Sequence, residues 1–339
     1  MAHVSLEDLL SQLSGQVGLP REVVGSLVGC LDRTVSRHRK GAVSTDGSQP
    51  TLVVNERNAL AKVEDFLARL PANFALQVHG RGIVVCAGGE RMLRCAWVCI
   101  GMLRRAGCRL PVEIWHLNEA EVEPETQQHF RVMDVKFVNA EHVRRRHPVR
   151  ILNAWELKPY ALLHSSFEEV LLLDADNVPL YDPSALFSAE AYLDTGTVFW
   201  PDGEPLSATN PLWQILRLSP SLHSAFESGQ ILLHKKKCWR ELNLTVFLNE
   251  HSDFFYSHVH GDKDTFHLAW RLLDRPYTLM PFAIVRLLGT ICQHDFDGRR
   301  LFQHRNFSKW DGEAPIAGFS QEEACWQLLH QYDAPLPLA

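Results

Sequence analysis

The chain has 339 residues, of which 46% are hydrophobic and 22% are charged, and its 40 acidic and 34 basic residues give a net charge of −6. This length and composition suit one large α/β domain or two ordinary domains with a sizeable core, and they exclude a low-complexity chain. The negative balance also lacks the basic surface typical of nucleic-acid-binding and membrane-surface proteins, so we expect no nucleic-acid partner.

The N-terminus and the eight cysteines bear on the cellular compartment. Residues 1–8 lack the basic and then apolar pattern of a signal peptide, and no apolar run is long enough to cross a membrane. Most cysteines have apolar neighbours and no zinc-type spacing, as buried thiols do. We therefore expect a soluble, cytoplasmic protein without a transmembrane segment. Nothing in the sequence indicates its oligomeric state.

The first eighty residues are predicted to be helical. Leucine and valine recur at helical spacing from a capping-box start at Ser5 to about Leu31. A second amphipathic helix is expected from about Glu56 to Leu70, where Pro71 ends it. We therefore predict a helical appendage over residues 1–78, and its sequence carries no chemical signal.

From Gly82 the pattern changes to strands that alternate with helices. An apolar strand over 82–87 runs into a glycine turn, and a helix, two strands and a second helix over 154–165 follow. This alternation predicts a doubly wound, mostly parallel sheet with right-handed crossovers. We assign residues 79–312 to that domain and residues 313–339 to a C-terminal helix and tail.

The most informative stretch is 169–180, in which an apolar run ends in two carboxylates, Asp174 and Asp176. Such a run is typical of a buried parallel strand, and ligands of open α/β sheets bind outside the carboxyl ends of the strands. Two oxygen donors at this place suit a divalent cation that also binds substrate phosphates. A bare Asp-x-Asp is also common in solvated turns, and that interpretation stays open here.

Other polar residues near predicted strand ends could complete such a site. His304 ends a short predicted strand, and as a third ligand it would favour Mn²⁺, because imidazole suits Mn²⁺ better than Ca²⁺. Arg305 and Lys158 could hold phosphate oxygens. Each of these residues is also common as an ordinary surface or helix residue.

Three acidic residues could face a polyhydroxylated ligand. Asp262 and Asp264 flank Lys263 in a predicted loop that opens a helix, where they could equally form an N-cap. Glu227 precedes Ser228 and a glycine, and small residues allow a ligand to approach closely.

Several blocks in chain order resemble the core of GT-A-fold glycosyltransferases. The early blocks are Trp155-x-x-Lys158-Pro159-Tyr160-Ala161, Ser165-x-Phe167 and Val170-Leu171-Leu172-Leu173-Asp174-Ala175-Asp176-Asn177. Later blocks are similar to those of the fungal α-mannosyltransferase family, glycosyltransferase family 71: Glu227-Ser228-Gly229-Gln230, Gly261-Asp262-Lys263-Asp264-Thr265 and Phe302-Gln303-His304. The resemblance covers roughly residues 80–310.

The resemblance implies a GT-A nucleotide-sugar-binding fold, with a Rossmann-like mixed, mostly parallel sheet flanked by helices. It implies a retaining glycosyltransferase that forms an α-glycosidic bond on a hydroxyl-bearing acceptor, whether a glycan, a protein or a small molecule. Asp174, Asp176 and His304 would hold Mn²⁺ or Mg²⁺. GDP-mannose is the favoured donor, and UDP-glucose, UDP-galactose or UDP-GlcNAc is the alternative. Fungal members are membrane-anchored Golgi enzymes, whereas we expect no anchor here.

The resemblance also assigns roles to further residues. Lys158 or Arg305 would stabilise charge on the leaving β-phosphate, and Glu227 or Asp202 would stabilise the oxocarbenium-like sugar. A covalent adduct on Glu227 and a same-face reaction assisted by the leaving phosphate both stay open. The residues expected to contact the donor are Cys86, Ala87, Gly88, Arg91, Lys158, Asp174, Ala175 and Arg305. The residues expected to contact the sugar or the acceptor are Asp262, Asp264, Trp200 and Gln230.

Two other functional classes fit parts of the pattern. A haloacid-dehalogenase-type phosphatase also has an apolar strand before Asp-x-Asp, with Asp174 as nucleophile and Asp176 as acid. That motif normally opens its domain, whereas about 170 residues precede it here. An inactive nucleotide-sugar-binding protein would be favoured if the metal-binding residues were missing, and they are present.

Overall fold

The computed structural model describes residues 53–71, 74, 76–221, 224–311 and 315–334. The predicted helix near residues 5–31 lies outside these residues. The residues from Val53 onward form one compact unit. Of the predicted appendage, the described part contains helix α3 (Ala59–Arg69), which is shorter than the expected 56–70 and packs against α10 (Trp239–Glu250).

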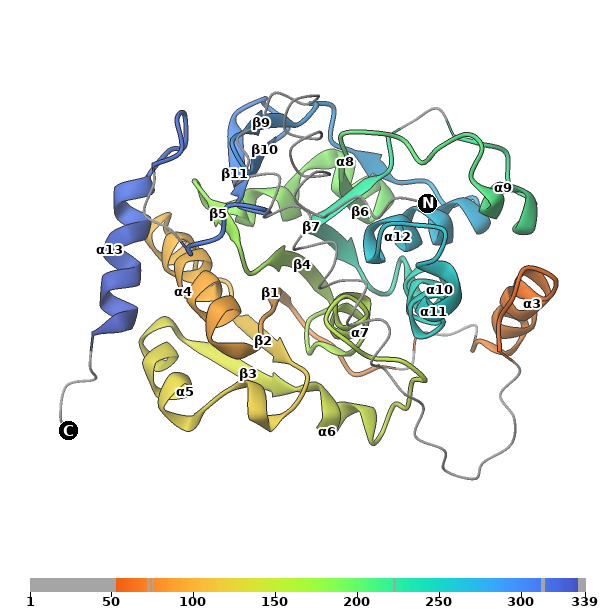
Figure 1. Cartoon of the computed structure of the whole chain (residues 1–339), viewed down its shortest axis with the longest axis horizontal. Coiled ribbons are helices and arrows are strands. Elements are labelled where there is room, and N and C mark those ends of the chain that lie inside the picture. The colour runs from red at the N-terminus through yellow and green to blue at the C-terminus, as the bar shows by residue number, and fades with distance from the viewer. Residues whose placement is uncertain (1–52, 72–73, 75, 222–223, 312–314, 335–339) are drawn as a thin grey trace, which may run out of the picture. The chain divides into compact units, whose positions relative to one another are not determined.

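A seven-stranded sheet forms the centre of this unit, in the order β3-β2-β1-β4-β7-β6-β8 (Figure 1). Strands β1 to β4 pair with one another in parallel, β7 is antiparallel to both β4 and β6, and β6 is parallel to β8. The predicted mixed, mostly parallel sheet is therefore confirmed. The strands are β1 (Arg81–Cys86), β2 (Val112–His116), β3 (Val135–Asn139), β4 (Glu169–Asp174), β6 (Thr197–Pro201), β7 (Phe226–His234) and β8 (Thr278–Leu279).

A second, antiparallel sheet of four strands begins where β4 ends. Its order is β5-β11-β10-β9, and β5 (Asn177–Pro179) follows β4 after two residues. The register of β5 and β11 pairs Asn177 with His304. The junction between the two sheets therefore carries both motif carboxylates. The other strands are β9 (Val285–Leu287), β10 (Thr290–His294) and β11 (Arg300–His304).

Helices cover both faces of the main sheet. On one face lie α4 (Gly89–Arg105) and, packed against it, α13 (Glu322–Asp333). On the other face lie α7 (Leu157–His164), α10 and α12 (Asp262–Leu272). The remaining described helices are α5 (Pro124–Phe130), α6 (Ala140–Arg144), α8 (Glu190–Thr195), α9 (Pro211–Ile215) and α11 (Ser252–Phe255). No described helix combines the length and the apolar character needed to cross a membrane.

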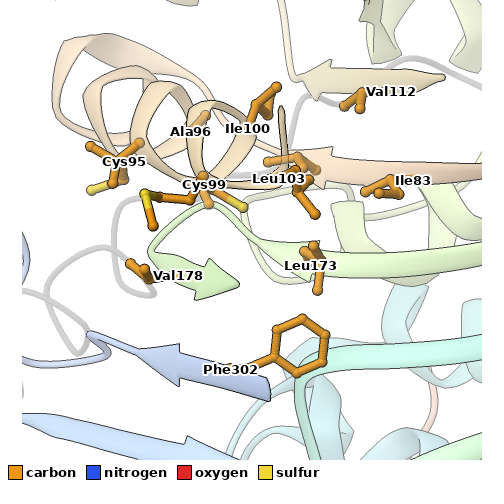
Figure 2. Close-up of a cluster of buried hydrophobic side chains, with 14 of the residues drawn as sticks. Ile83, Cys95, Ala96, Cys99, Ile100, Leu103, Val112, Leu173, Val178 and Phe302 are labelled. Carbon is orange, nitrogen blue, oxygen red and sulfur yellow. The ribbon is translucent and has the colours of Figure 1, made fainter. Parts of the chain in front are cut away.

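The apolar strand runs supply two separate cores, because successive side chains of a strand point to opposite faces. Ile83 and Leu173 belong to the core under α4, whereas Val84 and Leu172 belong to the core under α7 and α12. Figure 2 shows the first core, in which Cys99 and Leu103 of α4 lie over Ile83 and Leu173. Val178 and Phe302 extend this core into the second sheet, so the junction between the sheets is firmly packed.

Candidate metal and nucleotide site

Three predicted ligands converge at the junction between the sheets. Asp174 is the last residue of β4, Asp176 precedes β5, and His304 is the last residue of β11. His304 Nε2 lies 3.1 Å from Asp176 Oδ1 and 3.6 Å from Asp174 Oδ2. The Arg305 N–H donates to the Asp176 carbonyl at 3.0 Å, which continues the β5–β11 pairing and fixes the two segments side by side.

These residues fit a divalent cation. One ligand atom from each of the three side chains lies within 4.8 Å of the others. Oxygen and imidazole donors in one set suit Mn²⁺ and related ions. His304 Nδ1 faces Glu227 Oε1 at 3.8 Å, and a carboxylate behind a ligating histidine commonly orients the ring. Asp176 and His304 are only 3% and 5% exposed, so the site is largely shielded from water.

Two lysines flank the carboxylates. Lys158 Nζ, from α7, lies 2.8 Å and 2.9 Å from the two oxygens of Asp174. Lys309 Nζ donates to Asp176 Oδ2 and, at 3.3 Å, to the Asn306 carbonyl. The sequence predicted Lys158 and missed Lys309, because residues 305–311 have no helix or strand periodicity. The only signal for Lys309 is its position shortly after His304.

The charged side chains of this group shift the pKa values of one another. Burial alone would raise the pKa of Asp176, but Lys309 and His304 outweigh it and hold that pKa well below its usual range. Burial alone would lower the pKa of His304, but Asp176 and Asp174 raise it above its ordinary value. Lys158 behaves in the same way, because Asp174 and Asp262 outweigh its burial and raise its pKa. The site is therefore a compact cluster of alternating charges.

Asp262 lies beside this cluster, in the first turn of α12. Its Oδ2 is 3.6 Å from Lys158 Nζ, and burial raises its pKa to about 6 although Lys158 opposes the shift. The predicted loop at this point is wrong, because the helix already begins at Asp262 and its N-cap is Gly261. Gly261 has a φ of +78°, and a Cβ there would approach the Trp155 ring to 2.9 Å.

Asp202 and Asp264 line a neighbouring groove. Asp202 follows β6 and pairs with Lys263, and Asp264 Oδ2 accepts the His260 N–H at 3.0 Å. Pro201 of β6 pairs with Phe226, next to Glu227, so this groove lies at the same end of the sheet as the metal ligands. It has a volume of about 560 Å³ and is lined by Asp202, Glu204, Pro205, Leu206, Ser257, His258, Val259, His260, Lys263, Asp264 and Arg286.

The predicted nucleotide-binding segment lies beside the metal ligands. Cys86 pairs with Asp174 on one side and with Trp115 on the other. The Ala87 N–H donates to the Trp115 carbonyl at 2.9 Å, so Gly88 is the first residue beyond the sheet. Burial raises the pKa of the Cys86 thiol, and its partly buried side chain packs against the core under α7 and α12. Ala175 is 1% exposed between the two motif carboxylates.

Two residues that were predicted to contact the donor, Arg305 and Arg91, pair with other parts of the chain instead. Arg305 is 1% exposed and points to α13, where it pairs with Glu322 at 3.1 Å and lies 3.8 Å over the Trp310 ring. The structure therefore places Lys309, and not Arg305, at the motif carboxylates. Arg91 forms an exposed ion pair with Asp311.

Trp200 and Gln230 are buried, contrary to the open sugar-binding positions expected for them. Trp200 is 1% exposed and donates its indole N–H to the His294 carbonyl at 2.8 Å. Gln230 is completely buried, and its Oε1 accepts from Asn177 Nδ2 at 3.0 Å. Both positions fall on strands whose two faces are covered, so their side chains support the junction and do not face solvent.

The chain matches a family model described as "Mannosyltransferase putative" over residues 80–224 and 219–305. The alpha-1,2-mannosyltransferase MNN2 of Saccharomyces cerevisiae is 27% identical over 65% of this chain and 44% of its own length. MNN24 of Candida albicans, also an alpha-1,2-mannosyltransferase, is 27% identical over 67% of this chain and 39% of its own length. The chain thus spans less than half the length of these relatives. The glycosyltransferase GlyE of Streptococcus pneumoniae superposes with a TM-score of 0.46 and 13% identity, covering 74% of this chain and 60% of GlyE.

Proposed function

The chain belongs to this mannosyltransferase family, and from that membership we propose that it is a metal-dependent, retaining transferase that moves mannose from GDP-mannose to a hydroxyl group. The observation that carries the proposal is the convergence of Asp174, Asp176 and His304 between two lysines. A nucleotide-sugar needs such a site, because its diphosphate carries negative charge that grows as the sugar leaves.

The lysines have the place and the charge to hold the diphosphate. Lys158 Nζ also lies 3.3 Å from Ser228 Oγ, so its ammonium group is held between β4 and β7. Lys309 comes from the opposite side, on the segment after β11. A phosphate group between them would receive two charge-assisted hydrogen bonds. A bound divalent cation would add Lewis-acid stabilisation of the leaving diphosphate.

Glu227 is the carboxylate best placed on the sugar side. Its Oε1 accepts the Gly229 N–H at 2.9 Å, and the side chain is 13% exposed. From there it can form a covalent adduct, whose two displacements retain the anomeric configuration, or stabilise the oxocarbenium-like centre while the acceptor attacks on the face that the leaving phosphate leaves. Asp202, by contrast, is neutralised by Lys263 and belongs to the neighbouring groove.

We assign the acceptor to that groove. Asp202, Asp264 and the two histidines in its lining offer acceptors and donors for hydroxyl groups, and Leu206 and Val259 offer apolar surface. A polyhydroxylated acceptor such as a glycan fits this mixed lining. Its nucleophilic hydroxyl would enter between the groove and Glu227.

The test is ligand-induced stabilisation followed by turnover. We expect GDP to raise the melting temperature only when Mn²⁺ is present, because ligands that bind the folded state stabilise it by mass action. We then expect GDP release from GDP-mannose, and its loss in Asp176→Asn. A shift with UDP alone would replace the donor by a UDP-sugar, and turnover that survives in Asp176→Asn would remove the metal assignment.

Family membership supports the transferase over the phosphatase, and the two measurements test the remaining alternatives. The family model describes mannosyltransferases, which speaks against a phosphatase that uses Asp174 as nucleophile. An inactive binding protein would give the nucleotide shift without GDP release. The two measurements therefore separate all the alternatives.

A further inference from the structure

A half-buried carboxylate that the proposed reaction does not use lies at the carboxyl end of β1. Glu121 belongs to the short 3₁₀ turn Glu119–Glu121 that follows β2. Its Oε2 accepts the Leu117 N–H at 2.7 Å. A Cβ added to Gly88 would lie 2.1 Å from the same Oε2 atom, so the carboxylate packs directly on the Gly88 backbone. Among the described residues, Glu121 has no cationic partner.

The turn after β2 fixes the direction of this side chain. Asn118 begins the turn, and its Oδ1 accepts the Ala120 N–H at 3.0 Å. The Glu121 N–H donates to the Asn118 carbonyl at 3.2 Å. Val122, which follows, is only 4% exposed and belongs to the core under α4. Glu121 is thus anchored on both sides, and its carboxylate is held over the end of β1.

Sheet topology places this carboxylate in the crevice where a nucleotide would bind. The chain runs outward from β1 to β2 and β3 and then returns to β4 on the other side of β1, so β1 and β4 border the point where the strand order reverses. Ligands of open α/β sheets bind at that point. Adjacent strands lie about 4.8 Å apart, so Glu121, which packs on Gly88 after β1 and accepts the Leu117 N–H after β2, lies about 5–10 Å across the sheet from the end of β4. A nucleoside attached to a diphosphate at the end of β4 can span that distance.

Charge fixes the orientation of the ligand along this span. The cations Lys158 and Lys309 lie at the β4 and β11 ends, so the diphosphate belongs there. A carboxylate repels phosphate, so Glu121 must face the opposite end of the ligand, which is the nucleobase. A carboxylate accepts hydrogen bonds and cannot donate them.

From this geometry we propose that Glu121 reads the nucleobase and selects guanine, an inference that rests on the proposed function. The N1–H and the 2-amino group of guanine are two adjacent donors that match the two oxygens of a carboxylate. Uracil has a single N–H between two carbonyl oxygens, which would face the carboxylate unfavourably. Hypoxanthine keeps the N1–H and lacks the amino group. GDP, IDP and UDP therefore offer the carboxylate two adjacent donors, one donor, and one donor between two carbonyl oxygens, respectively.

Two variants of the full chain test the proposal from both sides of the contact. Glu121→Gln removes the charge and half of the acceptor capacity. Gly88→Ala keeps the charge and displaces the carboxylate, and the extended backbone of Gly88 (φ −145°, ψ 150°) accepts alanine. Glu119→Gln, in the same turn, is the matched control, because its side chain is 80% exposed.

The measurement is the dissociation constant of GDP, IDP and UDP by calorimetric titration in Mn²⁺. A hydrogen bond to a charged group is worth about tenfold or more in affinity, so we expect the unaltered protein to bind GDP about tenfold more tightly than IDP. We expect Glu121→Gln and Gly88→Ala to bring this ratio close to one, and Glu119→Gln to keep it.

The possible failures are distinguishable. An unchanged GDP-to-IDP ratio in Glu121→Gln, or tighter binding of UDP than of GDP to the unaltered protein, would overturn the role of Glu121. Absence of binding of every nucleotide to the unaltered protein would instead overturn the proposed function itself. Circular dichroism of each variant shows whether a change in the GDP-to-IDP affinity ratio is caused by unfolding. If one variant unfolds, the other variant tests the role of Glu121.

Discussion

At the scale of single residues, the site is organised by pairs of opposite charges. Each motif carboxylate has its own lysine, Lys158 for Asp174 and Lys309 for Asp176. An unpaired buried charge is costly, so these lysines stabilise the carboxylates whenever no cation is bound. In the proposed reaction, the same ammonium groups would move from the carboxylates toward a phosphate when metal and donor bind. Metal binding and lysine contact would then compete at the same oxygens.

Removal of Lys309 tests this competition. We expect Lys309→Ala to melt at a lower temperature without metal, because the buried Asp176 loses one of its two cationic partners and keeps only His304. We expect Mn²⁺ alone to stabilise this variant more than it stabilises the unaltered protein, and kcat/KM to fall by about 100-fold because a preorganised donor to the leaving group is lost. Thermal unfolding in a Mn²⁺ titration and steady-state kinetics measure both effects. Lys309→Arg keeps the charge as a control, and equal Mn²⁺ shifts in both proteins would contradict the idea.

Gly229 shapes the position of His304. A Cβ at residue 229 would lie 2.5 Å from His304 Nδ1 and 2.8 Å from its Cε1. We expect Gly229→Ala to displace the imidazole and weaken Mn²⁺ binding by about 10–100-fold, as loss of a supporting contact does at metal sites. Gly101→Ala is the matched control, because its Cβ would meet Leu328 at 2.8 Å, away from the site. That control should lower stability and leave Mn²⁺ affinity unaltered.

At the scale of elements, the segment 305–311 follows β11 and contacts helix α13. The Phe307 and Ser308 N–H groups both donate to the Gly289 carbonyl between β9 and β10. Arg305 pairs with Glu322 of α13 and stacks on Trp310, and all three side chains are at least largely buried. This segment therefore contacts helix α13 and the turn between β9 and β10. These contacts hold Lys309 in position beside Asp176.

The Arg305–Glu322 pair should be structural. We expect Arg305→Met to destabilise the protein by about 3–5 kcal/mol, the usual cost of breaking a buried ion pair by removing one partner. The double variant Arg305→Met with Glu322→Leu should recover part of that loss, because no charge is then left unpaired. Denaturant unfolding of the four proteins of the cycle gives the coupling energy. Additive effects would show that the two side chains do not interact.

At the scale of the whole molecule, the site joins two sheets and is supported by helices on both faces. Titratable groups far from the site therefore influence its stability through the fold. His164, at the end of α7, is stacked 4.5 Å from His147 and 4.4 Å from the Tyr160 ring. Burial, with the nearby His147 and Lys235, lowers the pKa of His164 to about 3.

This depressed pKa predicts acid sensitivity. Unfolding restores the ordinary pKa near 6.5, so between pH 6.5 and 3 the unfolded chain binds the additional proton. The free energy of unfolding therefore falls as the pH decreases below 6.5, by about 1–2 kcal/mol at pH 5 from this residue. His164→Gln should flatten that part of the stability profile, measured by urea unfolding from pH 7 to pH 5. A profile that keeps its slope in the variant would rule out His164 as the cause.

The sequence predicted much of the molecule for identifiable reasons. Long apolar runs such as 170–173 indicate buried strands, and an abrupt change to Asp174 marks a strand end, so the sheet and the position of the two carboxylates at its edge could be anticipated. The antiparallel insertion of β7 beside β4 could not, because pairing is set by contacts distant in sequence. Trp200 was misplaced because a strand covered on both faces buries every side chain. Lys309 was missed because it lies in an irregular segment, whose sequence has neither helix nor strand periodicity.

The junction between the sheets has a consequence for the newly made chain. The two carboxylates belong to one short stretch, but His304 lies 128 residues beyond Asp176. Translation adds about 5–20 residues per second, so β4 and β5 leave the ribosome several seconds before β11 can pair with them. During that interval the nascent chain has an acidic stretch without its imidazole. The cluster of Asp174, Asp176 and His304 can therefore form only late in synthesis, once β11 and the segment that carries Lys309 have left the ribosome.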